Sequence, residues 1–165
     1  RGRRCGERLR DATCLSRSID WISKRSKHVN NEYTARSLRW FEEVWNQRRT
    51  ETIDEFLTAD SIAETEDGVL RGPDEFKKQV HAPMLDAFPD LHVDVEGTVT
   101  EDDSVVIRWK ATGTHQGDGL GIKATGRPIV IRGITWHRFR DDKLVGGGDY
   151  WSQESLKRQL QDTPQ

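Results

Sequence analysis

An aspartate and a histidine in the last third of the chain are residue types suited to acid/base chemistry. Asp149 is followed by the aromatic pair Tyr150 and Trp151, and His137 lies on the preceding predicted strand. An aspartate in water, with a pKa of about 4, is a weak base. Burial among aromatic residues raises that pKa and makes the group a more effective base near neutral pH. With His137 as a hydrogen-bond partner for Asp149 or for a ligand oxygen, the pair can remove a proton beside a carbonyl.

Structural interpretations of both residues stay open. Asp149 could cap a turn or pair with Arg108 or Arg132, because ion pairs in structural networks also perturb pKa values. His137, taken without further context, is typical of a core histidine whose hydrogen bonds are satisfied.

Six further residues are predicted to contact a bound compound. Tryptophans more often belong to the core than to a ligand platform, so only one or two of them are expected to touch a ligand. Asn46 either ends a helix through its side chain or reaches the site, and His115 either fixes a glycine-rich loop or faces the ligand. The predicted substrate-binding set is Trp40, Asn46, Trp109, His115, Thr135 and Trp151.

Other familiar site motifs are missing from the sequence. No glycine string follows a predicted strand and opens a helix, as dinucleotide binding requires, and there is no phosphate-binding Gly-Lys-Ser/Thr loop. A Gly-x-Ser-x-Gly nucleophile motif is also lacking. The five histidines have no paired spacing typical of zinc ligands, so no metal site is predicted.

Helices are predicted first along the body of the chain. Thr52–Glu55 matches a capping box that starts a short second helix, and Gly72–Glu75 is typical of the start of a third. Pro83 inside this third helix should bend or shorten it. The first helix is predicted from an apolar stripe at three- and four-residue steps, formed by Tyr33, Ser37, Trp40, Phe41, Val44 and Trp45.

Strands follow the helices. A short strand is possible at Ser61–Glu66, and alternating apolar residues predict four long ones. Helices followed by an antiparallel run of strands is the α+β pattern. Three helices can cover one side of a curved sheet, and the hollow between the two layers is the natural ligand site. The long strands are expected at about 91–96, 105–114, 129–139 and 144–151.

Composition fits one compact domain of 165 residues, with 33% hydrophobic and 33% charged residues. Six Trp, five Phe and two Tyr favour a folded chain. No apolar run approaches the roughly 18 residues that cross a bilayer. We expect a cytoplasmic protein.

The first thirty residues differ from the rest. Residues 1–30 carry nine Lys and Arg against three acids, whereas the whole chain has a formal net charge of -2. They are predicted to form a flexible or partly helical basic extension before a domain over 31–165. An acidic body suits neither a broad nucleic-acid surface nor a membrane surface. Cys5 and Cys14, the two cysteines of the chain, both lie in the extension, which favours a reducing compartment.

Several strings in the body occur together in a known family. One spans Val106–Gly117 (VIRWKATGTHQG), and Gly133–Phe139 (GITWHRF) follows it. With the shorter strings, they make the chain resemble the SnoaL-like polyketide cyclases over about residues 31–160. This resemblance implies the cone-shaped α+β fold of the nuclear-transport-factor-like (cystatin-like) superfamily, a curved antiparallel sheet wrapped around N-terminal helices. The shorter strings are Trp45-Asn46, Phe88–Leu91, Gly121-Ile122 and Thr125–Pro128.

The resemblance also implies a chemistry and its residues. Cyclases of the family close an aldol ring with no metal or organic cofactor: a C–H beside a carbonyl loses its proton, and the enolate attacks a second carbonyl. Their acid/base aspartate matches Asp149, and their histidine on the preceding strand matches His137. Gly146–Gly148 depart from the Glu-His-Trp-type run of many relatives, which leaves the substrate open.

Three hypotheses follow. The first is a cofactor-independent cyclase or isomerase for a small hydrophobic carbonyl compound. The second is a protein that binds such a compound without chemistry. The third is an interaction module that dimerises through the outer sheet face, where Ile134, Trp136 and Arg138 alternate with Thr135 and His137. A homodimer is compatible with all three.

Overall fold

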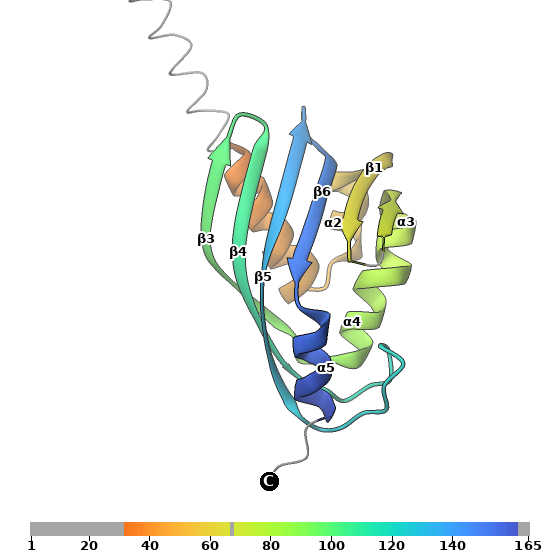
Figure 1. The fold of residues 1–165 in the computed structure, drawn as a ribbon. Coiled ribbons are helices and arrows are strands. Elements are labelled where there is room, and N and C mark those ends of the chain that lie inside the picture. The colour runs from red at the N-terminus through yellow and green to blue at the C-terminus, as the bar shows by residue number, and fades with distance from the viewer. Residues whose placement is uncertain (1–31, 67, 162–165) are drawn as a thin grey trace, which may run out of the picture.

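The computed structural model describes residues 32–66 and 68–161, which form an α+β fold with a curved sheet (Figure 1). The basic extension lies outside the described residues, as does the end of the chain. An α-helix at residues 32–40 opens the fold. The other elements are η1 (Phe41–Asn46), α2 (Thr50–Phe56), β1 (Leu57–Thr65), β2 (Gly68–Arg71), α3 (Gly72–Phe76), η2 (Lys77–His81), α4 (Ala82–Ala87), β3 (His92–Glu101), β4 (Ser104–Thr114), β5 (Pro128–Arg140), β6 (Lys143–Trp151) and α5 (Gln153–Gln161).

The sheet has six strands in the order β2-β1-β6-β5-β4-β3. All four long strands are confirmed, and β1 and β2 extend the sheet beyond them. Neighbours run antiparallel except for β1 and β6, which are parallel. The predicted cone-shaped α+β fold is therefore confirmed, with this one parallel pair as a difference.

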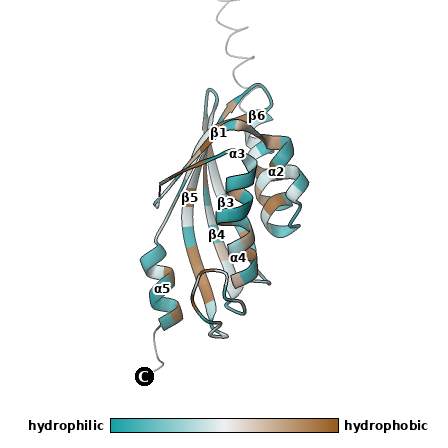
Figure 2. Cartoon of the chain, turned by 90° about the vertical axis from the view of Figure 1, so that its right-hand side faces the viewer, coloured by the Kyte–Doolittle hydropathy of each residue, from teal (hydrophilic) through white to brown (hydrophobic). Residues whose placement is uncertain are grey.

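The first helix continues directly into the π-helical turn η1 and crosses behind the sheet in Figure 1. Its predicted stripe faces the strands: Trp40, Phe41 and Val44 are buried in the same core as Ile107 and Phe139. In Figure 2, α2, α3 and α4 lie together on one side of the strands. The helices thus cover the inner face of the sheet, as the apolar periodicity predicted.

Pro83 neither breaks nor ends the third helix. α3, η2 and α4 follow one another without a gap from Gly72 to Ala87, and the π-helical turn η2 immediately precedes the proline turn. Proline lacks an N–H and crowds the carbonyl four residues before it. A wider turn at that point accommodates both effects, so the helix continues to Ala87.

The predicted capping box at Thr52–Glu55 is wrong. α2 begins at Thr50, and no side chain caps it. Thr52 Oγ1 instead donates to Glu43 Oε2 at 2.6 Å, and Glu55 accepts two hydrogen bonds from the Arg39 guanidinium. These side chains are used between helices, because partners from the first helix lie within reach once the chain is folded.

Side-chain amides pair with two open strand edges. Asn46 donates to Val93 O on β3 at 3.1 Å, and its Oδ1 accepts from Val93 N at 2.8 Å. Gln159 of α5 makes the same two contacts with Val130 on β5, beyond the last paired residue of β6. Each amide satisfies backbone groups that a missing strand would otherwise pair.

The glycine-rich segment between β4 and β5 packs closely on α4. A Cβ at Gly117 would lie 2.0 Å from Asp86 O, and one at Gly119 would lie 2.3 Å from Pro83 O. Only glycine allows this approach of two backbones. None of the helices in the described part of the chain is long and apolar enough to cross a membrane.

Candidate active site

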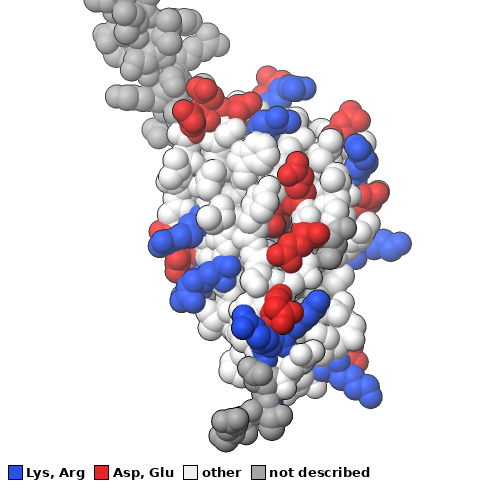
Figure 3. All heavy atoms as spheres, in the orientation of Figure 1, with Lys and Arg blue, Asp and Glu red and all other residues white. Residues whose placement is uncertain are grey.

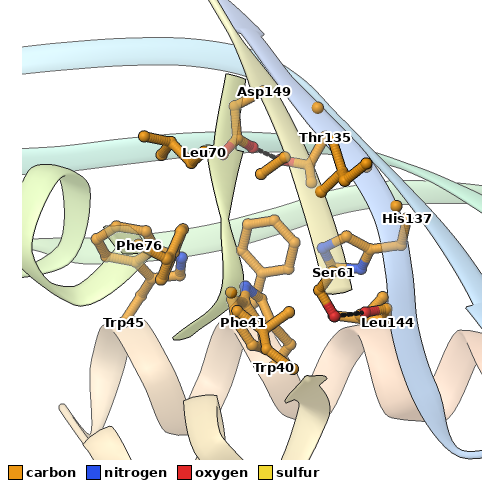
Figure 4. Close-up of a pocket in the computed structure, with 17 residues that line it drawn as sticks. Trp40, Phe41, Trp45, Ser61, Leu70, Phe76, Thr135, His137, Leu144 and Asp149 are labelled. Atoms are coloured by element: carbon orange, nitrogen blue, oxygen red, sulfur yellow. Dashed lines mark hydrogen bonds between the residues drawn. The ribbon is translucent and has the colours of Figure 1, made fainter. Parts of the chain in front are cut away.

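Strands β5 and β6 bring the predicted pair to the inner face of the sheet. Their register sets Thr135 opposite Asp149 and His137 opposite Gly147. Because side chains two apart share a face, Thr135 and His137 point toward the helices together, as Figure 4 shows. Asp149 and His137 thus lie diagonally on adjacent strands, two residue pairs apart along the ladder.

A chain of two hydrogen bonds leads to Asp149. Trp109 Nε1 donates to Thr135 Oγ1 at 2.8 Å, and Thr135 Oγ1 in turn donates to Asp149 Oδ1. Trp109 and Thr135 are 8% and 5% exposed, so the bond between them is sheltered from water. Arg108 and Arg132, the arginines suggested as partners for Asp149, alternate with the inward residues of their strands and so lie on the other face of the sheet. Arg108 pairs with Glu96 instead.

The environment of Asp149 favours its neutral form. Burial raises the pKa of the Asp149 carboxyl above its ordinary value, and the hydrogen bond from Thr135 partly offsets that rise. Asp149 as a residue is half-buried, so its carboxyl group remains open to a hollow. A carboxyl group in this environment holds its proton to a higher pH than an exposed aspartate does.

His137 is held neutral in an aromatic box. Its Nδ1 lies 3.1 Å from Ser37 Oγ, and the rings of Trp40, Phe41 and Phe139 have centroids 6.0–6.1 Å from the imidazole. Burial lowers the pKa of His137 to about 3. The imidazole is therefore uncharged at neutral pH and can act as a hydrogen-bond partner rather than as a cation.

A narrow hollow lies between the first helix and β6. Its volume is about 50 Å³, which is room for a few water molecules. Asp149, Thr135 and His137 line it together with Gly146–Gly148, whose lack of side chains leaves this part of β6 bare. Figure 4 shows Trp40, Phe41, Trp45 and Phe76 closing it from the helical side.

A wide hollow begins on the other side of Asp149. Its volume is about 360 Å³, within the range of sites for drug-sized molecules. Asp149 and Leu70 line both hollows, so the two meet at the carboxyl group. The wide hollow is mostly apolar, with Val80, Pro83, Met84, Leu120, Ile122, Trp151 and Leu156 in its wall and Gln79, Gln153 and Lys157 among its polar groups.

The predicted substrate-binding residues separate into two groups. Trp40 and Thr135 line the narrow hollow, and Trp151 lines the wide one. Trp109, Asn46 and His115 line neither. Trp109 directs its N–H to Thr135, and Asn46 pairs with the β3 backbone.

His115 holds the glycine-rich loop, as its structural interpretation suggested. It is fully buried; its Nδ1 accepts from Thr125 N at 3.2 Å, and its ring lies 5.4 Å from that of Phe88. Because Nδ1 accepts, the ring N–H is on Nε2, which has no hydrogen-bond partner among the described residues. His115 therefore stabilises the loop that carries Leu120 and Ile122 to the wide hollow.

Apart from Trp151, the wall of the wide hollow was not assigned to the site from the sequence, and neither were Ser37 and Leu70. Ser37 had a signal: it is a small polar residue within an otherwise apolar helical stripe. Leu70 and Leu156 had none, because their positions depend on how β2 and α5 fold back onto Asp149. In the described ranges, no group of three or more His, Cys, Asp or Glu is placed to hold a metal ion.

The chain belongs to the SnoaL-like polyketide cyclase family, whose model matches residues 35–160. Solved structures agree on the fold. A proposed SnoaL-like polyketide cyclase from Jannaschia sp. CCS1 is 20% identical, with a TM-score of 0.76 over 82% of this chain and 96% of that one. Comparison with curated proteins gave no match.

Two Streptomyces structures are also similar. AclR, a proposed hydroxylase from Streptomyces galilaeus, is 26% identical over 82% of this chain and 99% of that one, with a TM-score of 0.72. IdmH, a proposed polyketide cyclase from Streptomyces antibioticus, is 23% identical over 78% and 97%, with a TM-score of 0.69. One fold thus carries differently described activities, so function must be argued from the site.

Proposed function

We propose that this protein is an acid/base enzyme that removes a proton beside the carbonyl of a small hydrophobic compound, as a cyclase or isomerase does. The observation that carries the proposal is the position of Asp149, a carboxyl group with a raised pKa at the junction of two apolar hollows. As the family resemblance implies, the reaction needs no metal or organic cofactor.

Asp149 is the proposed catalytic base. Its carboxylate takes the proton from the carbon, the C–H electron pair becomes the enolate, and the carboxylic acid formed can return that proton. A positioned base contributes about 10²- to 10⁴-fold. The raised pKa brings the proton affinity of Asp149 closer to that of a carbon acid and so supports this role.

His137 is the proposed donor to the developing enolate oxygen. The neutral imidazole has one N–H, and an oxyanion donor of this kind contributes about 2.7–4 kcal/mol. A neutral donor suits a buried site, because no charge has to be desolvated when the substrate enters. Trp40, Thr135 and Trp151 are the proposed substrate contacts, since they line the hollows that meet at Asp149. The contacts predicted for Trp109, Asn46 and His115 would require a ligand to reach side chains outside both hollows.

Hydrogen–deuterium exchange at the α-carbon of ketones tests this function without knowledge of the product. A panel of cyclic ketones and β-keto esters is incubated in D₂O with the protein and followed by proton NMR. Asp149→Asn should reduce exchange at least a hundredfold while thermal stability changes little. Asp60→Asn, at an exposed position on β1, is the matched control and should keep the wild-type rate. Equal rates for the wild type and Asp149→Asn would refute the proposal.

Binding without chemistry is the alternative, and the wide hollow supports it equally well. In that case ketones of the panel would shift the NMR signals of Trp151 and Met84, which line this hollow, with no exchange above the buffer rate. The expected cytoplasmic location is a further prediction that this experiment does not address.

We also propose a homodimer through the outer sheet face. Val106, Ile134 and Tyr150 are 37%, 43% and 53% exposed there, and the Arg138 guanidinium lies over the Trp136 ring. Figure 3 shows an uncharged area on this face, bordered by acidic side chains on its right and by basic side chains below it. Apolar patches of this kind commonly mark interfaces. Sedimentation at several concentrations should show a dimer that Ile134→Lys weakens, and a monomer at every concentration would refute it.

A further inference from the structure

We propose that Trp109 and Thr135 are positioning residues for Asp149: they form a one-way hydrogen-bond relay that ties carboxylate oxygen Oδ1 and leaves Oδ2 to exchange the proton. The catalytic use of the relay rests on the function proposed above. The relay itself is a property of the folded protein and can be tested with no substrate.

The direction of the relay follows from its donors. An indole N–H can only donate, so Thr135 Oγ1 accepts the bond from Trp109 at 2.8 Å. The single hydroxyl proton of Thr135 is then directed to Asp149 Oδ1, which as a carboxylate oxygen accepts it. Without the indole, the hydroxyl could rotate and accept from a protonated Asp149 instead. Trp109 therefore selects the orientation of the hydroxyl that stabilises the ionised carboxylate.

The free oxygen is on the side of the hollows. Among the described residues none donates a hydrogen bond to Asp149 Oδ2, and the residue borders both hollows. A carboxylate held at one oxygen presents the other in a fixed direction. A base fixed in this way is already oriented when the substrate arrives, which is a large part of what an enzyme contributes to rate.

Gly133 is the local feature that makes the relay possible. It pairs with Trp109 across β4 and β5, and a Cβ at this position would lie 2.4–2.9 Å from three atoms of the indole ring. The missing side chain lets the ring lie across β5 toward Thr135, two residues further along the same face. The glycine thus has a function in positioning that goes beyond backbone freedom.

Few titratable or charged groups lie near Asp149, so few could shift its pKa in place of the relay or hide a shift that the relay causes. His137 on β5 is neutral, and Tyr150, next to Asp149 on β6, has a pKa raised above 10.0. Glu66 after β1 and Lys157 on α5 carry opposite charges and line the wide hollow. The groups that line the hollows from the first helix, η1, α3, η2 and α4 are not titratable.

Carbon-13 NMR of the aspartate carboxyl groups, recorded against pH, tests the relay directly. The signal of Asp149 is assigned by its loss in Asp149→Asn. Thr135→Val keeps the side-chain shape and removes the hydroxyl, so the pKa of Asp149 should rise by about one unit. Trp109→Phe and Gly133→Ala should raise it by a smaller amount, because the hydroxyl remains but is no longer oriented.

Thr135→Ser is the conservative control, and it should keep the Asp149 titration near that of the wild type. If Thr135 had a purely structural role, Asp149 should titrate at a similar pH in Thr135→Val and in the wild type, whatever the stabilities of the two proteins. If Thr135→Val fails to fold, Trp109→Phe and Gly133→Ala still decide the question. An Asp149 titration unchanged in Thr135→Val, or in both folded Trp109→Phe and Gly133→Ala, overturns the relay.

The ketone-exchange assay then separates the relay from the proposed function. If both hold, the acid limb of the pH profile of exchange should move upward in Thr135→Val by the same amount as the NMR titration, and Thr135→Ser should restore it. If the NMR titration shifts but Asp149→Asn exchanges normally, the relay holds and the proposed function fails. If Asp149→Asn abolishes exchange but Thr135→Val leaves the titration unchanged, the function holds and the relay fails.

Discussion

The narrow and the wide hollow share Asp149 but differ in what surrounds it. The narrow one, about 50 Å³, is closed by aromatic side chains and contains the neutral His137. The wide one, about 360 Å³, has a mostly apolar wall, with Glu66, Gln79, Gln153 and Lys157 among its polar groups. The narrow hollow has room for only the carbonyl end of an organic substrate, whereas the wide hollow has the size of a ligand site.

For Asp149, desolvation of the carboxyl group and access for a substrate can therefore come from opposite sides of the residue. The aromatic side leaves room for at most a few water molecules beside the carboxyl group, and this limited solvation raises its pKa. In the proposed function, the wide side receives the compound whose proton is exchanged. An aspartate enclosed from both sides would meet no substrate, and one open on both sides would keep a pKa of about 4.

Substitutions that fill each hollow in turn should distinguish the two hollows most clearly. Met84→Trp adds bulk in the wide hollow and should lower ketone exchange by about a hundredfold, because the substrate can no longer approach Asp149. Ala63→Val adds bulk in the narrow hollow and should reduce exchange much less. Met84→Leu, which conserves volume, is the control and should exchange like the wild type. A larger loss in Ala63→Val than in Met84→Trp would assign the substrate to the narrow hollow.

The dependence of the free energy of unfolding on pH should distinguish His137 from Asp149. Because the folded pKa of His137 is about 3 and its ordinary value is 6.5, acid protonates the unfolded chain first. Its contribution to stability is complete above pH 6.5 and falls by about 2 kcal/mol between pH 7 and pH 5. Asp149 has the opposite sign: its raised pKa lowers stability as pH rises from about 4 to the folded value.

Urea unfolding at pH 7 and pH 5 measures these slopes. His137→Phe, which keeps a ring in the aromatic box, should remove most of the loss toward pH 5. His81 is also buried and has a lowered pKa, so part of the stability loss toward pH 5 should remain in that variant. An undiminished loss in His137→Phe would mean that His137 is not the group responsible.

The smallest effect on the site is expected from Asn46, which lies outside both hollows. Asn46→Ala removes two hydrogen bonds to β3 and should lower the free energy of unfolding by about 1–3 kcal/mol. Gln159→Ala, which removes the equivalent pair at β5, is the natural comparison. Exchange per folded molecule should stay within about twofold in Asn46→Ala. A loss of exchange with unchanged stability would support the substrate contact that the sequence predicted for Asn46.

Alternation and helical spacing were sufficient to predict the long strands and the first helix. These patterns are local: a residue's face depends on its distance along the chain. The same logic correctly put Thr135 and His137 on one face of β5 and Trp136 on the other. The capping box at Thr52 failed because Glu43 and Arg39, from another helix, offered stronger partners to Thr52 and Glu55.

The candidate site was predicted only in part. Asp149 and His137 came from the resemblance, and the aromatic surroundings of Asp149 were expected from its neighbours. The relay through Trp109 was not foreseen, because it requires the register of β4 with β5 and a glycine opposite the indole. The wide hollow depends on β2, α4, the glycine-rich loop and α5, segments far apart in the sequence that meet at Asp149.

The amino-acid sequence by itself determined which faces of the strands and helices are apolar, and it supplied one acid and one imidazole to the same face of neighbouring strands. Only the tertiary structure decided which oxygen of Asp149 is tied, that His137 is neutral, and on which side a ligand has room. The physical reason is that hydrogen-bond direction and desolvation depend on atoms from several segments at once, whereas hydrophobic periodicity depends on one segment alone.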